Sequence, residues 1–199
     1  MDDFSRAALR SNSGHTSRRA WLLAAGGAAL MPFGTLALAQ SAPVASKNVA
    51  NAADGGAKAA LQPYVGVEPP AATRLISLSG ALTEIVYQLG GEALLVGSDT
   101  TSNYPEAANR MPKVGYVRQL AAEGVLSLKP DVVIGTTEAG PSVVLQQIAQ
   151  TRVAIALVRS DHSWDEVLRK TRLVGQATGR QAQAAQLAQD LQKEWDAVQ

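Results

Sequence analysis

A short strand and a helix follow one another in the stretch Arg74-Leu-Ile-Ser-Leu-Ser-Gly-Ala-Leu-Thr-Glu-Ile-Val-Tyr87. Its first six residues form a β-type run, and from Ala81 to Leu89 the apolar residues recur at helical spacing. The pair Gly90-Gly91 then ends the helix. A strand followed directly by a helix predicts the first unit of an α/β fold.

The same alternation continues along the chain. Pro141 stands at the start of one later helix, and the capping box Ser163-x-x-Glu166 opens another. Strands that alternate with helices indicate an α/β fold in which a parallel sheet is flanked by helices on both faces. The further strands are expected at residues 94–97, 131–135 and 153–158, and the helices at 142–150 and 164–177.

The binding site of such a sheet is expected on one rim, because ligands bind at the carboxyl ends of parallel strands. Four short segments follow the predicted strands and should therefore lie on this rim. They are residues 79–80, 99–100, 136–138 and 159–162.

The first 39 residues are typical of an export signal. The pair Arg18-Arg19 precedes an uncharged apolar run that ends in an A-x-A cleavage pattern at Ala39. We interpret residues 1–39 as a twin-arginine signal peptide that leads to the periplasm, with a permanent membrane anchor as the alternative. Residues 40–73 are rich in Ala, Ser, Asn, Gly and Pro, which predicts a disordered leader.

Composition excludes several classes of function. The 199 residues include no Cys, so disulfide scaffolds and thiolate metal sites are excluded. The formal net charge is +1 without a block of basic residues, which argues against binding to nucleic acid. The sequence also lacks nucleotide-binding loops and nucleophile motifs, and only one His remains after the predicted signal. We therefore expect a protein that is not an enzyme.

Four segments resemble the amino-terminal half of haemin-binding periplasmic proteins, the substrate-binding components of haem-importing ABC transporters. The resemblance covers about residues 74–178 and implies one lobe of a two-lobed binding protein. Residues 179–199 resemble the start of the rigid helix that joins the lobes, and by this resemblance we expect the second lobe to be missing from the chain. The four segments are residues 74–87, 95–105, 111–120 and 123–131.

The first and last of these segments are shared with periplasmic binders of cobalamin and ferric siderophores. Those ligands remain the alternative, and a catalytic α/β domain is a more remote one. The discriminating segment is Val114-Gly-Tyr-Val-Arg-Gln-Leu120. The resemblance implies that Tyr116 is the axial ligand of the haem iron, and that the loaded protein delivers haemin to an ABC permease.

The residues themselves support this role for Tyr116. Proteins bind haem iron through His, Cys, Met or Tyr, and a tyrosine must lose its proton to bind ferric iron well. Arg118 lies two residues on, and in an extended segment the two side chains would point the same way. We therefore expect the guanidinium of Arg118 to stabilise the phenolate of Tyr116.

Other side chains are candidates for lesser roles. Hydroxyls at a strand end could bind ligand carboxylates, a methionine could touch the porphyrin face, and the remaining His lies on the predicted rim. Two acidic residues could dock on the permease. For each, turn chemistry, packing or ordinary solvation is the alternative. The candidate cleft contacts are Thr100, Thr101, Ser102, Met111 and His162, and the candidate docking residues are Glu123 and Glu138.

The last helix carries an apolar stripe. Leu187, Leu191, Trp195 and Val198 recur at spacings that place them on one face of residues 181–199. An apolar face of this kind should pack against another part of the protein. Either the missing second lobe supplies it, or the helix docks on its own domain.

Overall fold

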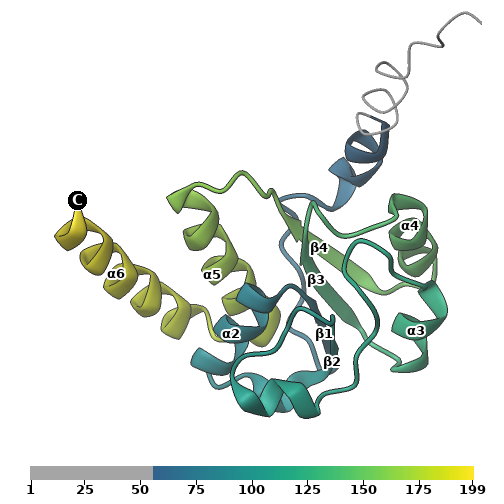
Figure 1. The fold of residues 1–199 in the computed structure, drawn as a ribbon, viewed down its shortest axis with the longest axis horizontal. Helices are drawn as coiled ribbons and strands as arrows, with labels where there is room; N and C mark the ends of the chain where they lie inside the picture. Colours follow the sequence, from purple (N-terminus) through teal and green to yellow (C-terminus); the bar gives the residue numbers. More distant parts are fainter. Residues whose placement is uncertain (1–55) are drawn as a thin grey trace, which may run out of the picture. The chain divides into compact units, whose positions relative to one another are not determined.

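The computed structural model describes residues 56–199 and contains a four-stranded parallel sheet (Figure 1). The strand order is β2-β1-β3-β4, so the first strand lies inside the sheet. All three strand pairs are parallel, as the sequence predicted. The strands are β1 (Leu75–Leu78), β2 (Leu95–Ser98), β3 (Val132–Thr136) and β4 (Ala154–Val158).

Helices cover both faces of the sheet. Figure 1 shows α2, α5 and α6 on one side and α3 and α4 on the other. The helix α3 was missed in the sequence because it has only six residues and too few turns for a periodic pattern. The α-helices are α2 (Gly80–Gln88), α3 (Ala122–Ser127), α4 (Ser142–Gln150), α5 (Trp164–Thr178) and α6 (Gln181–Val198), and the 3-10 helices are η1 (Gln62–Tyr64), η2 (Glu92–Leu94) and η3 (Glu106–Arg110).

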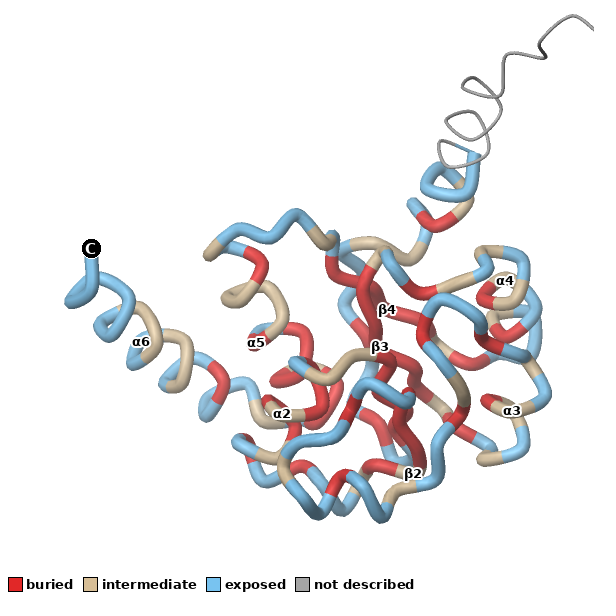
Figure 2. The backbone as a smooth tube through the Cα atoms, in the orientation of Figure 1, coloured by how far each residue is buried: buried red, intermediate tan, exposed pale blue. Residues whose placement is uncertain are grey.

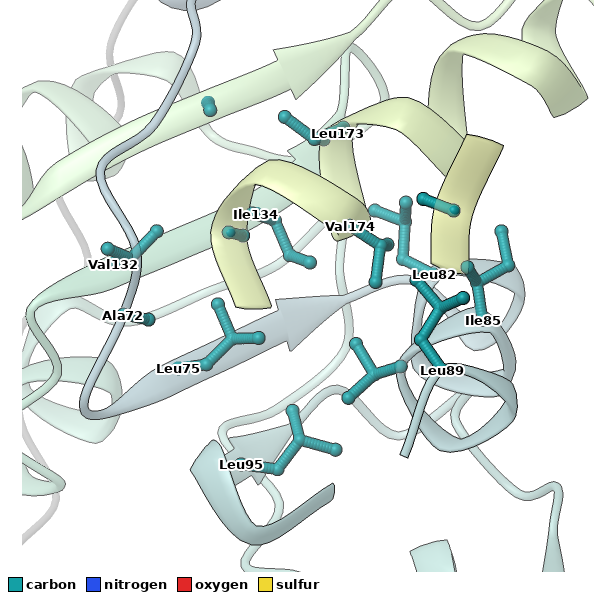
Figure 3. Close-up of a cluster of buried hydrophobic side chains, with 14 of the residues drawn as sticks. Ala72, Leu75, Leu82, Ile85, Leu89, Leu95, Val132, Ile134, Leu173 and Val174 are labelled. Carbon is teal, nitrogen blue, oxygen red and sulfur yellow. The ribbon is translucent and has the colours of Figure 1, made fainter. Parts of the chain in front are cut away.

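Two apolar clusters hold these layers together. Successive side chains of a strand point to opposite faces, so Leu75 packs under α2 and α5 while Ile76 packs under α3 and α4. Figure 3 shows the first cluster, in which Leu82 of α2 and Val174 of α5 meet the sheet. Burial of both faces explains why every residue of β1 and β3 is buried (Figure 2).

The segment before β1 is ordered where we expected a disordered leader, and that prediction is wrong for residues 56–73. Residues 56–61 are helical, and Val65 forms a parallel bridge with Leu157 of β4. Leu61 is only 3% exposed in the α3/α4 cluster. Composition averaged over the leader concealed these few apolar side chains, which are sufficient to anchor a short segment at the edge of the sheet.

The last helix docks on its own domain, as one of the two alternatives proposed. Leu187 packs against the α2/α5 cluster, and the rings of Trp164 and Trp195 stack with centroids 4.7 Å apart. The indole nitrogen of Trp164 also donates a hydrogen bond of 2.6 Å to Gln192. The far end of α6 stays exposed, since Val198 is 76% exposed.

Close approach of α5 and α6 depends on a glycine. A Cβ on Gly175 would lie 2.4 Å from the Cβ of Ala184. We expect Gly175→Ala to force the two helices apart and to lower the free energy of unfolding by about 1–2 kcal/mol. Urea denaturation measures this effect.

The matched control is Gly124→Ala in α3, where the nearest atom would lie 3.4 Å from the new Cβ. This change should stabilise the protein by up to about 1 kcal/mol, because alanine favours a helix over glycine. Equal effects of the two substitutions would contradict the close packing of α5 on α6.

Candidate functional site

A small hollow opens at the carboxyl ends of β1 and β3. Its volume is about 140 Å³. The sequence predicted that the strand ends share one rim, and this hollow lies there. We call it the Tyr116 hollow; its lining residues are Leu78, Ser79, Thr101, Tyr116, Val117, Arg118, Thr136 and Glu138.

The loop that carries Tyr116 is tied to the sheet. The Val114 N–H donates to the carbonyl of Ser98, and the Thr100 N–H donates to the carbonyl of Gly115, each at 3.0 Å. Gly115 has a φ of 109°, a conformation that side chains with a Cβ rarely adopt. The loop therefore presents the Tyr116 ring, 43% exposed, from a defined backbone.

The orientation of Arg118 differs from our expectation. Residues 116–119 form a turn, closed by a hydrogen bond of 2.8 Å from the Gln119 N–H to the Tyr116 carbonyl, so the extended geometry that we assumed is wrong. The guanidinium binds the carboxylate of Glu138 at 2.7 Å. A carboxylate is charged at neutral pH and attracts the guanidinium more strongly than a neutral phenol does.

Glu138 thus belongs to the rim of the hollow, where the sequence predicted residues 136–138. It follows β3 and is partly exposed, with 39% of its side chain accessible. Its proposed role in permease docking stays a prediction. The same holds for Glu123, which is exposed in the first turn of α3.

Ser102 is not a cleft contact. It is fully buried, and its hydroxyl binds the carboxylate of Asp99 at 2.7 Å and the hydroxyl of Thr83 at 2.8 Å. The Thr101 hydroxyl donates to the same carboxylate, although Thr101 still lines the Tyr116 hollow. These hydroxyls brace the loop that follows β2, which is the turn chemistry that we gave as the alternative.

Lys113 braces this loop from the other side. Its ammonium donates to the hydroxyl of Ser98 and to the carbonyls of Ser102 and Ala108, at 2.6–3.1 Å. Burial lowers the pKa of Lys113 more than nearby Asp99 raises it. At the base of the site, these polar groups thus form a network in which hydrogen bonds within the protein already occupy their donors and acceptors.

The remaining candidates lie away from the Tyr116 hollow. Met111 is partly buried and packs against the α2/α5 cluster, which is the packing that we gave as its alternative, and its role as a porphyrin contact stays a prediction. Thr100 is exposed next to the loop that carries Tyr116, and its backbone N–H holds that loop through the hydrogen bond to Gly115. Tyr104 is 68% exposed and does not line the Tyr116 hollow. His162 lines a neighbouring hollow that also contains Arg118 and Glu138.

Glu166 positions the loop that carries His162. Its carboxylate accepts the N–H groups of Asp161 and His162 at 2.8 and 2.7 Å and binds the Lys170 ammonium at 2.7 Å. Burial raises the pKa of Glu166, but the Lys170 and backbone contacts outweigh it and hold the pKa below its ordinary value. One of the two hydrogen bonds of the predicted capping box is confirmed, since the Ser163 hydroxyl accepts a hydrogen bond from the Glu166 N–H.

Two further structural features bear on function. Among residues 56–199, no group of three or more His, Asp or Glu side chains gathers as metal ligands. In the same part of the chain, no helix has both the length and the apolar character to cross a membrane. The predicted signal peptide at 1–39 lies outside the described residues.

The chain is similar to a periplasmic heme-binding protein from Pseudomonas aeruginosa of known structure. The two share 40% identity with a TM-score of 0.59, over 61% of this chain and 44% of that chain. An uncharacterized ABC transporter substrate-binding lipoprotein of Bacillus subtilis is 28% identical over 63% of this chain and 40% of its own length. A vitamin B12-binding protein of Vibrio vulnificus is 35% identical over 39% of this chain and 28% of its own length.

The matched region therefore spans less than half of each of these relatives. The family model for periplasmic binding proteins matches residues 75–199, which is most of the part of the chain that the structure describes. This family consists of binding proteins and not of enzymes, in agreement with the interpretation of the sequence. From its sequence and from its α/β lobe, this chain belongs to the periplasmic binding protein family.

Proposed function

We propose that this chain binds haemin in the periplasm for delivery to an ABC importer. The observation that carries the proposal is the ring of Tyr116, which stands 43% exposed in a hollow at the carboxyl ends of the strands. Tyrosine is among the few side chains that bind haem iron. In the described residues, no cluster of conventional metal ligands competes for this role.

The position of Arg118 suits the same chemistry. It lines the Tyr116 hollow, and only one of its nitrogens takes part in the bond to Glu138. A guanidinium has five N–H donors, so the remaining ones are available to a phenolate that forms beside it. Arg118 would then bridge Glu138 and the iron-bound Tyr116, instead of serving Tyr116 alone.

The second candidate ligand is cobalamin. The similarity to vitamin B12-binding proteins favours it, because the Vibrio vulnificus protein shares 35% identity over 77 residues. Cobalamin already carries its own axial base, so it has no need of a tyrosinate. The exposed, loop-braced phenol therefore favours haemin.

Titration of the chain with haemin and with cobalamin tests the proposal. We expect haemin to give a Soret shift and the charge-transfer band of high-spin tyrosinate haem, and cobalamin to bind at least about tenfold more weakly. Tight binding of cobalamin without a tyrosinate band from haemin would overturn the proposal and favour the second candidate.

The route and the partner are part of the same proposal. The pair Arg18-Arg19 favours export through the twin-arginine route. An ABC permease is the proposed partner, with Glu123 as a docking residue on the exposed first turn of α3. Support for an importer comes from the similarity to an ABC transporter substrate-binding lipoprotein of Bacillus subtilis.

A further inference from the structure

A hollow of about 320 Å³ opens between α5, the carboxyl end of β4 and the segment that precedes β1. Three arginines line it together with five apolar side chains, and the arginines are Arg159, Arg169 and Arg172. We call it the Arg159 hollow. None of its lining residues belongs to the Tyr116 hollow, so the two are separate places on the lobe.

Contacts within the lobe fix the walls of the Arg159 hollow. Val65 forms its parallel bridge with Leu157, which holds one wall against the edge of β4. On the other side, the guanidinium of Arg169 binds the carboxylate of Asp161 at 2.6 Å and reaches the carbonyl of Arg159 at 3.5 Å. The loop after β4 is therefore tied to α5, and Arg169 already has a carboxylate partner.

The other two arginines keep their donors for a ligand. Arg159 and Arg172 are exposed, and neither side chain takes part in a hydrogen bond or an ion pair within residues 56–199. A guanidinium stays charged at neutral pH and has five N–H donors. Glu68 is the one acid among the lining residues, and its carboxylate pairs with neither arginine. Two unpaired guanidiniums against one carboxylate leave an excess of positive charge.

The apolar part of the lining favours a ligand that is more than a bare anion. Leu157 and Leu173, each at most 5% exposed, belong to the interior side of the hollow, and Val67 at its edge is 42% exposed. An alkyl chain would remove this apolar surface from water, which contributes about 25 cal/mol per Å². The volume lies near the lower end of the range for small-molecule pockets.

We propose that the Arg159 hollow binds a small carboxylate that carries an apolar chain, with Arg159 and Arg172 as the partners of the carboxylate. The chain lies against the valines and leucines of the lining. Bonds between a guanidinium and a carboxylate are charge-assisted and frequently bidentate, so the hollow selects ligands with a free carboxylate. The site goes beyond the proposed function, because it needs neither Tyr116 nor iron.

Calorimetric titration of the chain with octanoate, octanamide and acetate tests this proposal. Octanamide keeps the alkyl chain without the charge, and acetate keeps the charge without the chain. We expect octanoate to bind at least about tenfold more tightly than either. Arg159→Gln together with Arg172→Gln should lower the affinity for octanoate about tenfold and leave that for octanamide unchanged. Far-UV circular dichroism checks the fold of this double variant.

Glu68→Gln provides a test of opposite sign. The carboxylate of Glu68 repels a second carboxylate in the same hollow, so its removal should raise the affinity for octanoate about threefold. The affinity for octanamide, which has no charge, should stay the same. An unchanged or lower affinity for octanoate in this variant would contradict the proposal, since a purely structural role of the lining gives no gain for an anion alone.

The matched control is Arg110→Gln, which removes an exposed arginine at the end of η3 that does not line the hollow. It should bind octanoate as the parent does. An equal loss in this control and in the double variant would overturn the site, because overall charge would then explain both. Equal affinities of the parent for octanoate and for octanamide or acetate would overturn it as well.

Haemin titration keeps this site apart from the proposed function. The double variant should give the same tyrosinate band as the parent, because the Arg159 hollow shares no residue with the Tyr116 hollow. Loss of the band in the double variant would overturn the separation of the two sites. Absence of the band from the parent would overturn the proposed function and leave the octanoate result unaffected.

Discussion

Tyr116→Phe is expected to abolish the tyrosinate band and to lower the affinity for haemin by about 100-fold, or about 2.7 kcal/mol. The substitution removes only the phenol oxygen. The ring keeps its volume, and the loop keeps its backbone bonds to Ser98 and Thr100. The fold should therefore survive. Absorbance titration with haemin measures the loss, and far-UV circular dichroism checks the fold.

Tyr104→Phe is the matched control for this prediction. Tyr104 is a more exposed tyrosine, 68% accessible against 43% for Tyr116, and it does not line the Tyr116 hollow. The spectrum of haemin with this variant should equal that of the parent. Loss of the band in Tyr104→Phe, with its retention in Tyr116→Phe, would assign the iron to the loop after β2 instead.

Glu166→Gln is expected to lower the free energy of unfolding by about 3 kcal/mol at neutral pH, the usual cost of breaking a buried ion pair. The side chain of Glu166 is 5% exposed and that of its partner Lys170 is 16% exposed. The variant keeps an oxygen for the N–H groups of Asp161 and His162, but it leaves the ammonium of Lys170 unpaired. Urea denaturation at neutral pH measures the difference.

The same variant has a defined pH dependence. The pKa of Glu166 lies below its ordinary value in the folded protein, since contacts to Lys170 and to backbone N–H groups outweigh the effect of burial. Its stabilisation is therefore complete above the unfolded pKa of about 4.3 and is lost as the pH falls through the lower folded pKa. The difference between parent and variant should shrink below about pH 4. A difference that stayed constant down to acidic pH would contradict the role of the Glu166 carboxylate.

Much of the fold was predictable because its signals are local. Each strand is a run of apolar residues that the two helical layers bury on both faces, and each long helix has its own apolar spacing. The helix at Ser142–Gln150 begins and ends where its sequence indicated. The position of residues 136–138 on the rim was predictable as well, because the carboxyl ends of parallel strands meet at one edge. Tyr116 follows no strand, so its choice rested on the family resemblance and only the structure shows that its loop reaches this rim.

Only the tertiary structure decided which side chains meet across that rim. Arg118 and Glu138 are 20 residues apart and lie on separate loops, so no periodic pattern links them. From the sequence, the hydroxyl of Ser102 was a candidate ligand contact. In the structure it is buried and hydrogen-bonded to Asp99 and Thr83, so it is not accessible to a ligand. Secondary-structure propensity depends on a few neighbouring residues and is therefore visible in the sequence. Which charged side chains pair with one another depends on the distances between them, and these are set only when the sheet has folded.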